Sequence, residues 1–197
     1  MLYLLDTNAY LRLAKSIDPL LGAGFVAATD AIRITSECDT EWKNSNRLQT
    51  KFEWVGESQY SLNRSANTVK LTAKQMMAVR NARTVIQAFA SGHGKQLKEN
   101  RATVPSPADC LALAYVFALC EDGVPATVVT DDAGMHLIAK EFEISMVASL
   151  DLLSVMLHAK TRTTEEISAL AKYLHYIDDL PQDWRTRGRR ILGITLP

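Results

Sequence analysis

Acidic side chains stand at or near the places where predicted strands end or predicted helices begin. Asp6, Asp131 and Asp132 follow strands, Asp109 opens a helix, and Glu41 lies one and a half turns into the helix after the second strand. Two carboxylates about 5 Å apart repel each other by roughly 3 kcal/mol at an effective dielectric constant of about 20, so a cluster of acids requires a cation or bound protons. Oxygen ligands without histidine or cysteine favour Mg²⁺ or Mn²⁺. Such an ion activates water and neutralises charge that develops on a phosphoryl group, which points to hydrolysis of a phosphate ester.

The elements that must position these acids alternate between short apolar runs and helical patterns. Strands are predicted at Tyr3 to Leu5, Ala31 to Thr35, Pro125 to Thr130 and Ile144 to Val147. Helices are predicted after Asn8, after Ser36, over 66–90 as one helix or two, from Ser106 through Phe117, over 135–139, over 150–157 and over 164–176. This alternation predicts an α/β fold with a parallel sheet and right-handed crossovers. Functional residues gather beyond the carboxyl ends of such strands, and the acids fall there.

Each acid also has a purely structural interpretation. Asp6 and Asp132 are suited to capping the helices that follow them, because an aspartate oxygen accepts from the free N–H groups of a first helical turn. Asp109 follows Ser106 by three residues, as in a capping box, and Glu41 is compatible with a solvated helix surface. The functional interpretation depends on all these acids sharing one edge of the sheet.

Four segments of the chain resemble, in order and spacing, the motifs of the PIN-domain ribonuclease family. They are Leu4-Leu5-Asp6-Thr7-Asn8, Ile34-Thr35-Ser36-Glu37-Cys38-Asp39-Thr40-Glu41-Trp42, Pro107-Ala108-Asp109-Cys110-Leu111-Ala112-Leu113-Ala114 and Val128-Val129-Thr130-Asp131-Asp132. The resemblance covers about residues 1–150. It implies a PIN-like, flavodoxin-like parallel sheet flanked by helices.

The resemblance also implies which acids do the chemistry. Asp6, Glu41, Asp109 and Asp132 match the four acidic positions of the family and are the expected catalytic residues. The implied metal ligands are Asp6, Asp109 and Asp132, with the neighbouring Asp131 as a further candidate. Mg²⁺ or Mn²⁺ is the implied cofactor.

Two polar residues match positions that support the ligands in the family, namely Asn8 and Thr130. The second acidic position is the least specific of the four. Glu37 and Asp39 compete with Glu41 for it, because all three lie within one short predicted helix.

The resemblance implies a metal-dependent endoribonuclease that hydrolyses RNA phosphodiester bonds. Many bacterial members are VapC-like toxins held in check by a cognate antitoxin, so a type II toxin–antitoxin role is expected. The expected partners are RNA, an antitoxin protein and a second copy of the chain. The expected organisation is a nuclease domain over 1–150, with a basic, mostly helical middle at about 43–101, and a C-terminal helical extension over 151–197. Both the long stretch between Glu41 and Asp109 and this extension depart from the compact family pattern.

The formal net charge of zero is a cancellation between blocks. Residues 43–101 hold eleven basic side chains against three acids, whereas residues 102–159 hold one base against eight acids. A basic block beside acid-rich ones is compatible with a phosphate-binding face near a metal cleft, or with a solvated helical surface. The RNA-binding candidates in this block are Lys43, Arg47, Lys51 and Trp54. An aromatic ring such as Trp54 either stacks on bases or packs in the core.

Composition excludes several other classes. With 47% hydrophobic and 22% charged residues the chain is ordinary for a folded protein. Its longest apolar run, Cys110 to Cys120, is too short to span a bilayer, and the N-terminus lacks the basic region of a signal peptide. Three cysteines without C-x-x-C spacing fit a reducing cytoplasm.

Two rival functions remain open at this stage. An inactive PIN-like scaffold that binds RNA or protein is compatible with the weak second motif. A phosphohydrolase with Asp6 as nucleophile is disfavoured, because Asn8 stands where a second aspartate would act as the acid. The sequence has no glycine-rich phosphate loop and no serine or cysteine in a nucleophile elbow.

Overall fold

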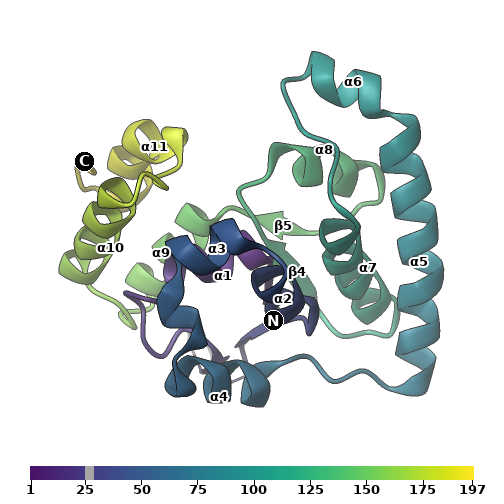
Figure 1. Cartoon of the computed structure of the whole chain (residues 1–197), viewed down its shortest axis with the longest axis horizontal. Helices are drawn as coiled ribbons and strands as arrows, with labels where there is room; N and C mark the ends of the chain where they lie inside the picture. Colours follow the sequence, from purple (N-terminus) through teal and green to yellow (C-terminus); the bar gives the residue numbers. More distant parts are fainter. Residues whose placement is uncertain (25–28) are drawn as a thin grey trace.

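A five-stranded sheet lies at the centre of the computed structural model, which describes residues 1–24 and 29–197 (Figure 1). The strand order is β2-β3-β1-β4-β5. The strands are β1 (Leu2–Leu5), β2 (Gly22–Ala23), β3 (Ala31–Ile34), β4 (Ala126–Val129) and β5 (Met146–Val147). All pairings are parallel except that of β2 with β3. The α/β class and the four expected strands are confirmed, and the short antiparallel β2 was not predicted.

The register of the sheet brings the ends of three strands level with one another. Leu5 of β1 is paired with Ile34 of β3 on one side and with Val129 of β4 on the other. The residues that follow, among them Asp6 and Thr130, therefore emerge at one edge. Because β1 is the central strand, Asp6 stands in the middle of that edge.

Helices cover both faces of this sheet (Figure 1). The first helices along the chain are α1 (Thr7–Leu13), α2 (Glu37–Lys43), α3 (Asn46–Lys51), the short 3₁₀ helix η1 (Glu53–Gly56) and α4 (Ser58–Asn67). The long helix α5 (Ala73–Gly92) and the short helix α6 (Gly94–Glu99) follow. The remaining helices are α7 (Pro107–Glu121), α8 (Ala133–Glu141), α9 (Ser149–His158), α10 (Thr164–Tyr176) and α11 (Gln182–Leu192).

Local signals account for most helix boundaries. Ser106 caps α7 in a capping box with Asp109, as its sequence predicts. Most of the region 66–90, predicted as one helix or two, forms the single helix α5: α4 ends at Asn67, and α5 begins after Thr72, whose hydroxyl accepts from the backbone N–H of Gln75. The basic tail after Pro181 forms a further helix, α11, which the sequence reading did not predict.

Two cores sandwich the sheet, because successive strand residues point to opposite faces. Leu5 of β1 belongs to the core shared with α1 and the C-terminal helices, whereas Leu4 belongs to the core shared with α5, α7 and α8. Leu170 and Trp184 of α10 and α11 are fully buried in the first of these cores. The C-terminal helices thus contribute to the same core as the sheet.

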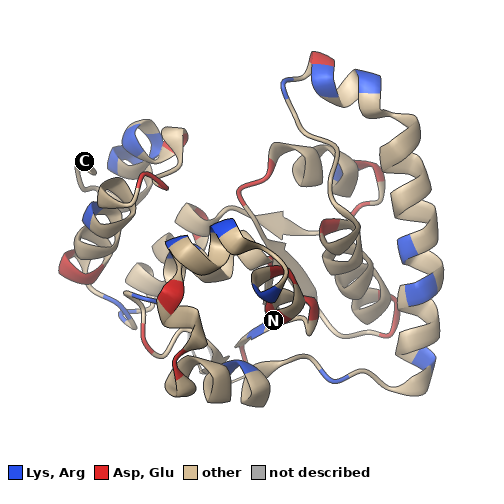
Figure 2. Ribbon diagram, in the orientation of Figure 1, with Lys and Arg blue, Asp and Glu red and all other residues tan. Residues whose placement is uncertain are grey.

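The basic block 43–101 is divided between two parts of the structure (Figure 2). Lys43, Arg47 and Lys51 lie on α2 and α3, which contact each other, while most of the others lie along α5 and α6. Arg64 is 2% exposed and belongs to neither surface. A charge count along the sequence therefore overstates any single basic face. Within the described residues no helix has the length and apolarity that crossing a membrane requires.

Candidate active site

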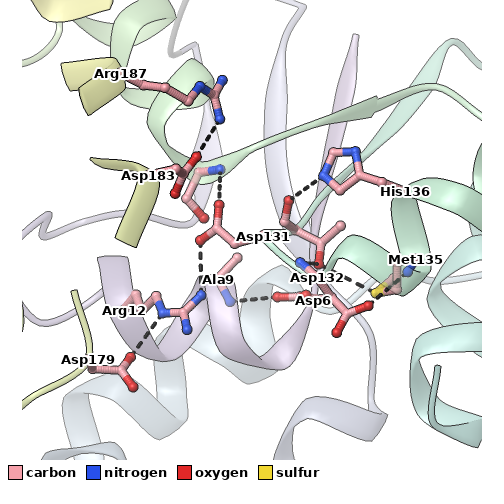
Figure 3. Close-up of polar contacts among 12 residues, drawn as sticks. Asp6, Ala9, Arg12, Asp131, Asp132, Met135, His136, Asp179, Asp183 and Arg187 are labelled. Carbon is pink, nitrogen blue, oxygen red and sulfur yellow. Dashed lines mark hydrogen bonds and ion pairs between the residues drawn. The ribbon is translucent and has the colours of Figure 1, made fainter. Parts of the chain in front are cut away.

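Asp6 leaves β1 at the middle of the sheet edge and caps α1. Its backbone N–H donates to the carbonyl of Val129 at 3.1 Å, and its Oδ1 atom accepts from the N–H of Ala9 at 2.5 Å (Figure 3). The side chain is buried, and its Oδ2 atom has no hydrogen-bond partner among the described residues. One carboxylate oxygen is therefore fixed by the cap and the other remains available.

The pKa of Asp6 is raised to about 7, chiefly by burial and to a smaller extent by the nearby carboxylates of Asp131 and Asp109. The Thr130 hydroxyl and the Ala9 N–H act against this shift. A carboxyl group with such a pKa is held in its charged form at neutral pH only at a cost to folding stability. A cation beside it would lower that cost.

Glu41 lies on α2 and faces α1 across the cleft. The hydroxyl of Thr7 donates to its Oε2 atom, so the first turn of α1 orients the carboxylate. Burial raises the pKa of Glu41, with further contributions from the charges of Asp109 and Glu37, while the Thr7 hydrogen bond lowers it. Glu41 and Asp109 therefore lie close enough for their charges to interact.

The two competitors for the second acidic position have other partners. Asp39 forms an ion pair with the buried Arg64, whose Nε atom lies 2.5 Å from its Oδ1 atom. Glu37 accepts from the hydroxyl of Ser36 at 3.0 Å on the exposed start of α2. Of the three acids of this helix, Glu41 is the one that lines the cleft described below.

Asp109 is held at the start of α7 by its capping box. Its Oδ2 atom accepts from the backbone N–H of Ser106 at 2.8 Å, and its own N–H donates to the Ser106 hydroxyl at 3.1 Å. Burial raises its pKa, the Ser106 hydrogen bonds lower it, and the charge of Asp132 raises it again. Asp109 is thus electrostatically linked to Asp6, Glu41 and Asp132.

Asp132 caps α8 at the end of β4. Its Oδ1 atom accepts from the N–H of Met135 at 2.8 Å, and its Oδ2 atom accepts from the Thr103 hydroxyl at 3.2 Å. Its N–H donates to Thr130 Oγ1 at 3.1 Å, so this threonine contacts Asp132 directly. A Cβ atom at Gly134 would lie 2.1 Å from the Thr103 carbonyl, so glycine permits this close approach.

Asp131 has a different environment from its neighbour. Its Oδ1 atom accepts from the backbone N–H of Ser149 at 2.9 Å, and its Oδ2 atom lies 3.0 Å from a guanidinium nitrogen of Arg12 (Figure 3). Both oxygens are engaged in these contacts. The structure therefore gives Asp131 the role of joining β4 to α9 and α1.

Glu41 and Asp109 border a cleft of about 460 Å³ between α1, α2, α3 and the start of α7. Its lining residues are Thr7, Asn8, Thr40, Glu41, Asn44, Ser45, Arg47, Leu48, Ser106 and Asp109. Arg47, an expected RNA-binding residue, lies at this cleft, and Asn8 is exposed there. Lys43 is exposed at the end of α2, and Lys51 pairs with Asp179 at 2.7 Å.

The expectation that Trp54 stacks on RNA needs correction. Trp54 is 5% exposed and packs in the core against Tyr10 and Tyr60, with ring centroids 6.2 and 4.5 Å away. A ring enclosed in this way presents no face to a base. The aromatic residues of the basic block were predicted to be either stacking platforms or core residues, and Trp54 is a core residue.

Among the described residues no three histidine, cysteine, aspartate or glutamate side chains are close enough together to hold a metal ion. The caps explain this spacing, because Asp6, Asp109 and Asp132 are each bound to the first turn of a different helix. Their donor type nonetheless fits a hard divalent cation, and the Oδ2 atom of Asp6 is a buried oxygen without a partner.

Sequence reasoning missed two residues of this edge. Arg12 of α1 joins Asp131 to Asp179 of the C-terminal segment, and Thr7 orients Glu41. Arg12 follows Asn8 by four residues, a spacing that places both on one face of a helix. The pairing of Arg12 with Asp179, however, spans 167 positions of the chain and leaves no local pattern.

No protein-family model matches the chain, and no curated protein matches it. Among solved structures, a match is found with a chain of VapBC2 from Rickettsia felis, in a crystal structure of that complex bound to a DNA fragment from the promoter. The two chains share 19% sequence identity, the TM-score is 0.36, and the match covers 75% of this chain and 98% of the other.

Proposed function

We propose that the chain is a metal-dependent endoribonuclease of the PIN-domain kind, with Asp6 at the centre of its site. The observation that carries this proposal is the buried carboxyl group of Asp6. It stands at the end of the central strand, has one oxygen without a partner among the described residues, and has a pKa raised to about 7. The charges of two further acids act on it. This is an environment in which a divalent cation would stabilise the charged form.

The residues that would hold Mg²⁺ or Mn²⁺ are Asp6, Glu41, Asp109 and Asp132. When bound, such an ion activates water and neutralises the charge that develops on a phosphoryl group. The chain's own contribution is to orient these carboxylates. Asp6 is fixed by Ala9, Glu41 by Thr7 and Asp109 by Ser106. Asp132 is fixed at both oxygens, by Met135 and Thr103. Ligation requires these side chains to turn within their caps.

Arg47 supports the choice of a phosphate substrate. It is an exposed cation at the same cleft as Glu41 and Asp109. Guanidinium groups position nucleic acids by contacting phosphate oxygens without reading the sequence. The cleft thus combines carboxylates that could bind a cation with an arginine that could bind a phosphate of the substrate.

A cleavage assay tests the proposal. Purified protein is incubated with an end-labelled RNA of mixed sequence, in Mn²⁺, in Mg²⁺ or in excess EDTA. We expect cleavage with either metal and none in EDTA, with activity restored when metal is added back in excess. Cleavage at the same rate in EDTA would contradict the metal-dependent chemistry.

An inactive scaffold is the second candidate, and one observation favours it. The described residues present no three acids at metal-binding distance. A thermal melt separates the two candidates, because a ligand that binds only the native state raises the midpoint. At Mn²⁺ about 100 times its dissociation constant the stabilisation is about 2.7 kcal/mol, or roughly 5–10 °C for a chain of this size. An unchanged midpoint at millimolar Mn²⁺ favours the scaffold.

The proposed biological role is that of the toxin of a type II toxin–antitoxin pair, acting in the cytoplasm. This part rests on the resemblance of the four sequence motifs. It is tested by coexpression with the product of a short neighbouring reading frame. We expect a stable complex in which RNA cleavage is inhibited; two proteins that do not associate would contradict the role.

A further inference from the structure

Asp179 lies between two cations, Arg12 and Lys51. Its Oδ2 atom is 2.9 Å from the Nε atom of Arg12, and its Oδ1 atom is 2.7 Å from the Nζ atom of Lys51 (the Arg12 contact is drawn in Figure 3). Lys51 also donates to the backbone carbonyl of Asp178 at 3.2 Å. One carboxylate of the turn between α10 and α11 thus binds side chains from α1 and α3.

The two cations continue the lining of the cleft by one helical turn. Asn8 and Arg47 line the cleft, and Arg12 and Lys51 follow them by four residues on α1 and α3 respectively. Residues four apart lie on the same face of a helix, one turn or about 5.4 Å further along. Arg12 and Lys51, which bind Asp179, therefore lie on the same helix faces as the cleft residues Asn8 and Arg47.

A carboxylate held between a guanidinium and an ammonium group resembles a phosphate in charge and in its acceptor oxygens. Arginine and lysine bind phosphate through the same donors. The site is partly accessible: the side chains of Arg12 and Asp179 are 20% exposed and that of Lys51 is 27% exposed. Asp131 also pairs with Arg12, so its charge offsets that of the guanidinium group. Asp179 is then the acid that a phosphate would replace.

We propose that Arg12 and Lys51 form a phosphate subsite for the RNA strand, and that Asp179 occupies this subsite in the free chain. The C-terminal segment then acts as an internal competitor that lowers the affinity for RNA. This inference rests on the proposed function, because it assumes that RNA lies along the cleft. It assigns a role to the turn between α10 and α11 that the acidic site does not require.

The test measures binding of a fluorescein-labelled 12-nucleotide oligouridylate by anisotropy, in EDTA to prevent cleavage. The variant is Asp179→Asn, which removes the charge at nearly constant volume. The matched control is Asp183→Asn, which makes the same change four residues on, where the acid pairs with Arg187 at 2.8 Å. Thermal melts check that both variants fold, and Asp179→Ser serves as a second neutral variant.

We expect Asp179→Asn to bind at least threefold more tightly than Asp183→Asn in 50 mM salt. Its plot of log affinity against log salt should be steeper by about 0.7, the contribution of one added phosphate contact on a single strand. Adding Lys51→Met to Asp179→Asn should remove the gain. Equal affinities and slopes for Asp179→Asn and Asp183→Asn would overturn the subsite, while metal-dependent cleavage by the wild type would leave the proposed function standing. RNA binding by none of the proteins, together with no metal-dependent cleavage by the wild type, would overturn both.

Discussion

Asp131 and Asp132 are adjacent in the chain, but their carboxylates belong to different parts of the structure. Asp131 is bound by Arg12 of α1 and by the N–H that opens α9, whereas Asp132 caps α8 and its charge acts on Asp109. Both residues follow β4, and their separate partners on α1, α9 and α8 separate the two roles. In the proposed function Asp132 is therefore the metal ligand of this pair, whereas Asp131 has a structural role.

Asparagine substitutions at these two positions should have opposite consequences. Asp132→Asn should reduce RNA cleavage strongly and leave the fold intact, since asparagine is also a good N-cap. Asp131→Asn should retain cleavage but lose about 1–3 kcal/mol of stability, because the partly buried Arg12 loses a charged partner. Cleavage rates and urea melts of both variants check this. Equal loss of cleavage in the two variants, with no loss of stability in Asp131→Asn, would assign Asp131 to the metal site as well.

Glu41 and Glu37 provide a matched pair on one helix. Glu41→Gln removes a charge from the cleft while the amide oxygen still accepts from Thr7. We expect cleavage at least about 100-fold slower, which corresponds to about 2.7 kcal/mol of transition-state stabilisation. Glu37→Gln makes the same change one turn earlier and should stay within about twofold of the wild type. Single-turnover rates decide, and a larger defect in Glu37→Gln would transfer the second acidic position to that residue.

The raised pKa of Asp6 predicts that stability depends on pH. Its pKa is about 7 in the folded protein. An exposed aspartate in the unfolded chain has a pKa of about 3.9, so the folded state binds the proton more tightly. In the absence of metal this group lowers stability as pH rises from about 4 to 7, by up to about 4 kcal/mol, and adds no further change above that range.

Asp6→Asn should therefore stabilise the metal-free protein at pH 8 and leave it unchanged at pH 4, because asparagine keeps the cap to Ala9 without a charge. Thermal melts of both proteins at pH 4, 6 and 8 measure the difference, in which the other carboxyl groups cancel. A variant that is less stable than the wild type by the same amount at all three pH values would show that Asp6 carries no such penalty.

Trp54 should matter for folding and not for RNA affinity. Trp54→Ala should cost about 3–5 kcal/mol, as expected for a large aromatic side chain removed from a core. Trp54→Phe keeps most of the volume and should fold with unchanged affinity for the labelled oligouridylate. Weaker binding by Trp54→Phe at unchanged stability would restore the stacking role.

The elements that the sequence predicted well are those with local causes. The capping box of Ser106 and Asp109 lies within four residues, and α10 has the predicted bounds of 164–176. β2 is only two residues long and has no comparable signal. The pattern of α11 was present, since Trp184, Gly188 and Leu192 are buried at intervals of four, but four arginines concealed it.

In the candidate site, too, the features with local causes could be predicted and those with distant causes could not. Placement of Asp6 and Thr130 at one edge follows from strand ends that the sequence marks. The contacts that separate Asp131 from Asp132 come from Arg12 and Ser149, which are distant in the chain, so no local pattern reveals them. Burial of Trp54 likewise depends on Tyr10, which belongs to another segment.

The central claim is that Asp6 holds a catalytic metal ion, and one comparison tests it most directly. RNA cleavage is measured in saturating Mn²⁺ for the wild type, for Asp6→Asn and for the control Asp122→Asn. Asp122 is an exposed residue at the C-terminal end of α7, opposite to the end that carries Asp109. We predict that Asp122→Asn cleaves like the wild type and that Asp6→Asn, although folded and more stable at pH 8, cleaves at least 100-fold more slowly. Cleavage by Asp6→Asn at the wild-type rate would contradict the account.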